Sequence, residues 1–181
     1  NLISTGLGVD ISMACLEASS LNAVRSDVSN RARFVLSNWF ENINEKFDLI
    51  VFDWDGTLVD SADSIVFSLQ GAARDLGVTE PSNEEARYVI GLGLNEAIRN
   101  LFPSLSSQKL NVISDRYRHH YLTQNKKISL YKGASDVIKA LHAKSFLLAV
   151  ATGKSRAGLN RSFKSSGLGS FFHASRCADE T

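Results

Sequence analysis

Residues 48–61 read DLIVFDWDGTLVDS, and this stretch decides the fold more than any other part of the chain. It begins with a short run of apolar, β-prone residues. Such a run predicts a strand covered on both faces, as in the interior of a parallel sheet. Two aspartates, Asp53 and Asp55, follow the strand, and Gly56 turns the chain. Because ligands of parallel α/β sheets bind beyond the carboxyl ends of the strands, these carboxylates indicate a chemical site rather than solvated surface.

Strand and helix patterns alternate after this stretch. Residues 145–151 (SFLLAVA) form a second apolar run that leads into Thr152, Gly153 and Lys154, and a third run begins near residues 171–178. Helical periodicity dominates between the first two runs, with a capping-box pattern at residues 82–85. This order predicts an α/β fold. A Rossmann-like parallel sheet core would comprise residues 47–60 and 128–181, with an inserted α-helical cap at residues 61–127.

Residues 1–46 differ in composition from the rest of the chain and are predicted to form an N-terminal extension. Small and polar residues dominate its first half, which we interpret as a loose lead-in. Residues 31–47 (RARFVLSNWFENINEKF) then place apolar side chains at helical spacing. We expect one amphipathic helix there, which either packs on the domain as a structural appendage or binds a protein partner.

Bulk composition narrows the classes of function. The chain has 181 residues, a net charge of +1 and 44% hydrophobic residues, as expected for one globular domain with a small insertion. The sequence has no basic stripe interleaved with aromatic residues, so nucleic acid is not the expected partner. No apolar stretch reaches membrane-spanning length or resembles a secretory signal. Cys15 and Cys177 lie far apart without metal-ligand spacing, so a reducing, cytoplasmic location is expected.

The two strand ends carry complementary groups. Asp53 and Asp55 repel a phosphate unless a divalent cation lies between them, and Mg²⁺ binds through one or two carboxylates plus phosphate oxygens. Thr152, Gly153 and Lys154 supply a hydroxyl, backbone N–H groups at a helix start and a cation, which suit a phosphate. Together these groups predict phosphoryl transfer, since its catalysis rests on positioning and charge neutralisation.

These two segments resemble the motifs of a known family. FDWDGTLVDS (residues 52–61) is similar to the first motif, DxDGT, of the haloacid dehalogenase-like (HAD) hydrolase superfamily, and AVATGKS (residues 149–155) is similar to the second. VATGKSRAGLNRSF (residues 150–163) and IGLGL (residues 90–94) are most similar to its phosphoglycolate phosphatase-like branch. The resemblance covers residues 47–181, and the helical segment resembles the cap that this family inserts into its core.

The resemblance implies a role for each matching residue. Asp53 would be the nucleophile that forms an aspartyl-phosphate, and Asp55 would be the general acid and base. Magnesium would be held by the Asp53 carboxylate and the Asp55 backbone carbonyl. Thr152, the Gly153 N–H and Lys154 would bind the phosphate. The implied activity is Mg²⁺-dependent hydrolysis of a small phosphorylated metabolite similar to phosphoglycolate, because true dehalogenases lack an aspartate at the position of Asp55.

Several alternatives stay open at this point. Lys154 at a helix start is either solvent-exposed or a phosphate ligand, and Gly91 and Gly93 either shape a cap loop that faces the substrate or break a helix. The basic cluster at residues 116–120 is expected on a solvated helix face. A P-loop is excluded because its first glycine would fall at Leu148, inside a strand. Three cap residues are candidates for contact with the substrate: Arg87, Tyr88 and Arg99.

Two further parts of the family pattern are not found before Thr181. They are the third-motif lysine and the fourth-motif aspartates that would complete the magnesium site. We therefore expect a core that is incomplete at its C-terminus, with the first strand at a sheet edge and low activity of this chain by itself. Three functions are considered: a phosphatase, a non-catalytic remnant that keeps a phosphate- or partner-binding surface, and a sugar-phosphate mutase.

Overall fold

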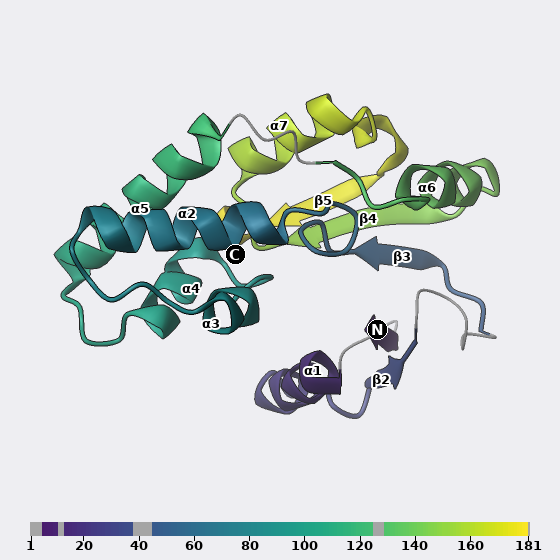
Figure 1. Ribbon diagram of the computed structural model, residues 1–181. Helices are drawn as coiled ribbons and strands as arrows, with labels where there is room; N and C mark the ends of the chain where they lie inside the picture. Colours follow the sequence, from purple (N-terminus) through teal and green to yellow (C-terminus); the bar gives the residue numbers. More distant parts are fainter. Residues whose placement is uncertain (1–4, 11–12, 38–44, 125–128, 181) are drawn as a thin grey trace. The chain divides into compact units, whose positions relative to one another are not determined.

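The computed structural model describes residues 5–10, 13–37, 45–124 and 129–180 (Figure 1). The chain divides into two compact units, Asn1–Phe47 and Asp48–Thr181. Each is described by itself. Within the described ranges, none of the helices combines the length and the apolar character that crossing a membrane requires.

The N-terminal unit contains a small βαβ arrangement. Strands β1 (Gly6–Asp10) and β2 (Ala32–Leu36) pair in parallel, and helix α1 (Met13–Arg25) connects them. The expected helix over residues 31–47 is therefore wrong in its described part, and the segment expected to be a loose lead-in carries the helix instead. A short apolar run is compatible with both a helix and a strand. Residues 32–36 form a strand because they pair with the distant strand β1. Residues 38–44 of the expected helix lie outside the described residues, and the protein partner expected on this segment stays a prediction.

The second unit contains a parallel sheet whose described strands follow the order β3-β4-β5. Strand β3 (Leu49–Phe52) pairs with β4 (Leu147–Thr152), which pairs with β5 (Ala174–Cys177). Helix α6 (Ala134–Ala143) precedes β4, and helix α7 (Arg156–Ser166) connects β4 to β5. The predicted α/β class with a parallel sheet is confirmed, and β3 lies at an edge of the described sheet.

The two faces of this sheet differ in how far helices cover them. Figure 1 shows α6 and α7 on the same face. Residues Phe52, Leu148 and Val150 are buried, with at most 6% exposure, whereas Leu49 and Val51 are 48% and 53% exposed. The expectation that the first strand is covered on both faces is therefore wrong for the described residues. The reason is topological, because right-handed crossovers that advance in one direction place their helices on one face.

Trp54, which lies between the two aspartates, anchors the end of β3. Its side chain is fully buried and lies edge-on to Phe163 of α7, with ring centroids 5.1 Å apart. It also lies edge-on to Phe172 at 6.1 Å, and Phe163 and Phe172 stack on one another. Burial of Trp54 thus ties the loop that carries Asp53 and Asp55 to the helix that follows β4.

The described residues of the insertion between β3 and α6 form four helices: α2 (Ala62–Asp75), α3 (Asn83–Tyr88), α4 (Leu94–Leu101) and α5 (Ser107–Thr123). They enclose an apolar cluster of their own, in which Leu69, Ile98 and Ile113 are almost fully buried. The predicted capping box opens α3, because Ser82 and Glu85 exchange hydrogen bonds between side chain and backbone. Figure 1 shows this helical cap beyond the carboxyl ends of the strands.

Candidate active site

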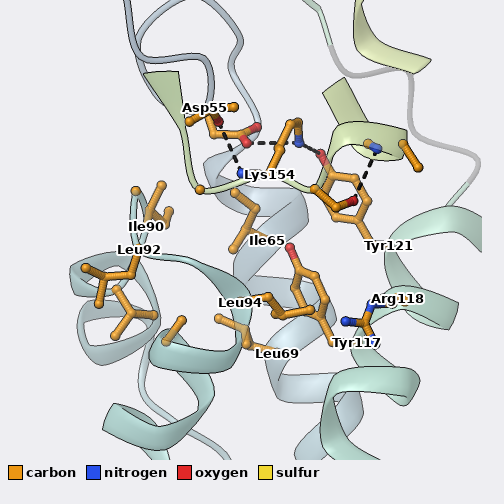
Figure 2. A pocket seen from close by; sticks show the side chains of 18 of the residues that line it. Asp55, Ile65, Leu69, Ile90, Leu92, Leu94, Tyr117, Arg118, Tyr121 and Lys154 are labelled. Carbon is orange, nitrogen blue, oxygen red and sulfur yellow. Dashed lines mark hydrogen bonds and ion pairs between the residues drawn. The ribbon is translucent and has the colours of Figure 1, made fainter. Parts of the chain in front are cut away.

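The ends of β3 and β4 bring the sequence-predicted residues together. The register pairs Phe52 with Val150, so the loops that follow the two strands lie side by side. A cavity of about 400 Å³ opens there and is lined by both core loops and cap helices (Figure 2). All five predicted site residues line it: Asp53, Asp55, Thr152, Gly153 and Lys154. Their co-location is therefore observed, while their chemical roles stay predictions.

Asp53 lies in an environment that disfavours its charged form. Burial raises the pKa of its carboxyl to about 7, and the neighbouring charge of Asp55 also raises it. Hydrogen bonds with the Trp54 backbone and the Thr57 side chain lower this pKa, as does the charge of Lys154, but they do not outweigh burial. Because an added positive charge favours a carboxylate, a bound cation would restore the ionised, nucleophilic form.

Asp55 and Lys154 form an ion pair inside the cavity. Lys154 Nζ lies 2.9 Å from Asp55 Oδ2, and both side chains are about a tenth exposed. The Ser61 hydroxyl donates to Asp55 Oδ1 at 2.6 Å. Lys154 Nζ also donates to the Tyr121 hydroxyl at 3.1 Å and lies 4.9 Å from the centre of that ring. Figure 2 shows the contacts from Asp55 through Lys154 to Tyr121, which link the core to α5 of the cap.

The ion pair keeps Lys154 cationic. Burial by itself would lower the pKa of Lys154, but the charge of Asp55 and the hydrogen bonds with Asp55 and Tyr121 outweigh it, so this pKa is raised. Of the two interpretations left open by the sequence, solvent exposure is wrong. The amino group is enclosed within the cavity, next to the acid predicted for proton transfer.

Gly153 packs directly against the cap. A Cβ at this position would lie 2.3 Å from the carbonyl oxygen of Leu92 and 2.9 Å from that of Gly91. Gly91 has a φ of +99°, in the left-handed region that favours glycine, and both Gly91 and Leu92 line the cavity. Gly91 therefore shapes a cap loop that faces the site, whereas Gly93 is the N-cap residue of α4.

The cap contributes a mainly apolar wall. Its apolar lining includes Ile65, Leu69, Val89, Ile90, Leu92 and Leu94. Tyr117 and Tyr121 of α5 also line the cavity. The site position of Ser61 and of the two tyrosine hydroxyls was missed, because helical spacing predicts which face is buried but not what that face contacts.

The three cap residues considered for substrate contact do not line the cavity: Arg87, Tyr88 and Arg99. Arg87 pairs with Asp63, and Tyr88 is 79% exposed. The basic cluster of α5 lies on an exposed face as expected, with Arg116 bound to Asp75. One of its members is an exception, because Arg118 reaches the cavity lining.

The described residues contain no cluster of three or more acidic, histidine or cysteine side chains that could hold a metal ion. Asp53 and Asp55 nevertheless suit the mode in which Mg²⁺ is held by one or two carboxylates, waters and phosphate oxygens of the substrate. The backbone carbonyl oxygen of Asp55 accepts no hydrogen bond from any described residue, so it is available as a further oxygen ligand. The donor set thus fits Mg²⁺ that arrives with a phosphate.

Residues 50–181 match the sequence profile of the haloacid dehalogenase-like hydrolases, and the chain belongs to this family. Tyrosine-protein kinase PtkA of Mycobacterium tuberculosis is 30% identical over 129 residues, which are 71% of this chain and 43% of that protein. A phosphoglycolate phosphatase of Aliivibrio fischeri is 28% identical over 118 residues, 61% of this chain and 52% of that protein. The chain thus spans about half the length of these curated relatives.

Solved structures agree with this membership. The chain superposes on a predicted phosphoglycolate phosphatase from Haemophilus somnus with a TM-score of 0.67 at 22% identity, covering 75% of this chain and 64% of that one. At this identity the likeness shows the fold alone. The structure of PtkA from Mycobacterium tuberculosis gives a TM-score of 0.61 at 30% identity, covering 72% and 60%. The resemblance to the HAD hydrolases and to the phosphoglycolate phosphatase-like branch is confirmed.

Proposed function

We propose that this chain carries the catalytic residues of a Mg²⁺-dependent phosphatase that hydrolyses a small phosphate monoester through an aspartyl-phosphate. One observation carries the proposal: the carboxylates of Asp53 and Asp55 and the loop at Thr152–Gly153 line one cavity. The relatives support it, because the names phosphatase, pyrophosphatase and kinase all denote enzymes that act on phosphoryl groups.

In the first step an Asp53 carboxylate oxygen attacks phosphorus. The new P–O bond to Asp53 forms as the P–O bond to the leaving group breaks, and Asp55 gives its proton to the departing oxygen, which leaves as an alcohol. The Thr152 hydroxyl and the Gly153 N–H hold the phosphate oxygens. Asp55 begins this step protonated, with the proton that it accepted from water in the second step of the preceding turnover. The ammonium group of Lys154 moves from Asp55 to the incoming phosphate when substrate binds.

In the second step a water molecule attacks the phosphorus atom of the aspartyl-phosphate. Asp55 accepts a proton from this water, the P–O bond to Asp53 breaks, and inorganic phosphate leaves with the Asp53 carboxylate restored. Mg²⁺ bound by the Asp53 carboxylate and the Asp55 carbonyl would neutralise charge between the nucleophile and the phosphate.

Hydrolysis of p-nitrophenyl phosphate tests the proposal, measured with Mg²⁺ and with excess EDTA. We expect Asp53→Asn to lower turnover by about a thousandfold or more, as for other covalent nucleophiles, and EDTA to abolish it. Asp136→Asn, which changes an exposed carboxylate on α6, is the matched control and should leave turnover unchanged.

Other results favour the alternative functions. Mg²⁺-dependent turnover that survives Asp53→Asn contradicts the mechanism. Binding of inorganic phosphate without any turnover favours the non-catalytic remnant. Release of free phosphate separates a phosphatase from a sugar-phosphate mutase, which would return the phosphoryl group to a second position of the sugar.

A further inference from the structure

We infer that the substrate is an aryl phosphate monoester, whose aromatic leaving group occupies the cap side of the cavity. This inference rests on the proposed function, which places the phosphate at the core side of the cavity. The inference adds the class of alcohol that the phosphate is esterified to, at the cap side. It differs from a short carboxylated ester such as phosphoglycolate.

The size and lining of the cavity support an apolar leaving group. About 400 Å³ lies within the range of pockets that enclose a ring-bearing ligand rather than a two-carbon acid. Beyond the phosphate-binding groups, the wall consists of side chains such as Ile65, Leu69 and Val89, of which Leu69 and Val89 are at most 4% exposed. A polyhydroxylated leaving group would leave hydroxyls unpaired against this wall. Each unpaired group costs on the order of 10- to 100-fold in affinity.

Charges in the cavity argue against a second acidic group on the substrate. Lys154 contacts Asp55 and Tyr121 in this structure, and in the proposed mechanism its ammonium group pairs with the substrate phosphate, so it is not free for a second acidic group. The other described cations of the lining lie at its exposed edge. Arg118 is 53% exposed and paired with Asp115, and Arg161 is exposed on α7. A carboxylate close to the ester bond would therefore face the apolar wall without a counter-charge.

Tyr117 adds a specific hydrogen-bond donor to this apolar chamber. Its ring stacks on that of Tyr121, with centroids 5.8 Å apart and planes at 23°, and Figure 2 shows its hydroxyl directed into the cavity. No described residue hydrogen-bonds to this hydroxyl. Burial raises the pKa of Tyr117 far above its usual range, so the hydroxyl stays a protonated donor. A flat aromatic ligand with an acceptor on its ring satisfies both the aromatic surface and the donor.

Binding of non-hydrolysable phosphonates to the full chain tests the inference without relying on turnover. We expect isothermal titration calorimetry with Mg²⁺ to give benzylphosphonate a dissociation constant about tenfold or more below that of phosphonoacetate. Tyr117→Phe should weaken 4-hydroxybenzylphosphonate about 3- to 10-fold and leave benzylphosphonate unchanged. Tyr88→Phe, which changes an exposed cap tyrosine outside the cavity, is the matched control and should alter neither.

A second variant keeps the test decisive if Tyr117→Phe disturbs the cap. Ile90 lines the cavity and lies outside the apolar cluster of the cap. We expect Ile90→Lys to reverse the preference toward phosphonoacetate, because it places a cation on the apolar wall. Equal or tighter binding of phosphonoacetate by the wild-type chain overturns the inference, as does failure of both phosphonates to bind.

The two proposals fail in different ways. If benzylphosphonate binds preferentially but no phosphate ester is hydrolysed, the ligand class stands and the phosphatase proposal fails. If hydrolysis occurs and requires Asp53, but phosphonoacetate binds more tightly than benzylphosphonate, the phosphatase stands and the aryl assignment is overturned.

Discussion

Replacing Gly153 by alanine tests the contact between the phosphate-binding loop and the cap. The added Cβ would lie 2.3 Å from the Leu92 carbonyl oxygen, whereas close carbon–oxygen contacts lie at about 3.3 Å. The cap loop at residues 91–92 must therefore move by about 1 Å, since its backbone atoms cannot rotate away as a flexible side chain would. Overpacking of this kind costs about 1–3 kcal/mol, and each kcal/mol lowers the melting temperature by roughly 4 °C in a unit of this size.

The displacement also separates the cap wall from the reacting groups. A misplacement of about 1 Å lowers turnover on the order of 100-fold, so we expect p-nitrophenyl phosphate hydrolysis by Gly153→Ala to fall by this amount. Circular dichroism measures the loss of stability, and amide hydrogen exchange in residues 89–93 measures the loosened loop without depending on activity. Gly6→Ala is the control, because nothing lies within 4 Å of its added Cβ.

The reasoning would be refuted by a Gly153→Ala protein that melts within about 1 °C of the wild type and keeps its exchange rates in residues 89–93. Such a protein would show that the cap loop does not rest on Gly153. A loss of stability without faster exchange in the loop would place the strain in the core instead, and would contradict the predicted movement of the cap.

Three further changes test other parts of the structure. Trp54→Ala removes a fully buried ring and should lower the free energy of unfolding in urea by about 3–5 kcal/mol; a loss below about 1 kcal/mol contradicts the packing. His120 and Arg116 hydrogen-bond to Asp75 and hold the pKa of that carboxyl below its usual range. The stability from this contact is present at neutral pH and lost as pH falls through the lowered pKa. The melting-temperature gap between wild type and Asp75→Asn should therefore close below about pH 4, and a gap that widens in acid contradicts this. Ser82→Ala removes the cap of α3 and should cost about 1 kcal/mol in thermal unfolding, whereas an unchanged melting temperature argues against the capping box.

The elements that were predicted correctly depend on local patterns. The apolar runs before Asp53 and before Thr152 are bounded by turn and helix-start residues, so their ends are visible in the sequence. The capping box at Ser82 is likewise local. The run at residues 31–36 has no such boundary, and it became strand β2 because β1, more than twenty residues earlier, pairs with it. A helical spacing over so few residues carries no information about that distant partner.

The sequence by itself determined the α/β class, the family and the two loops that carry the chemistry, because strand ends and turn residues are encoded by neighbouring positions. The tertiary structure decided which residues of other segments contact those two loops. The amino group of Lys154 contacts Asp55 and Tyr121, which are far from it in the chain, and Gly153 contacts the cap backbone at Leu92. The contact with Asp55 forms only when β3 pairs with β4, and those with Tyr121 and Leu92 form only when the cap packs onto the sheet. The physical reason is that the shape and polarity of a cavity depend on packing between distant segments, whereas a motif records only the residues within one of them.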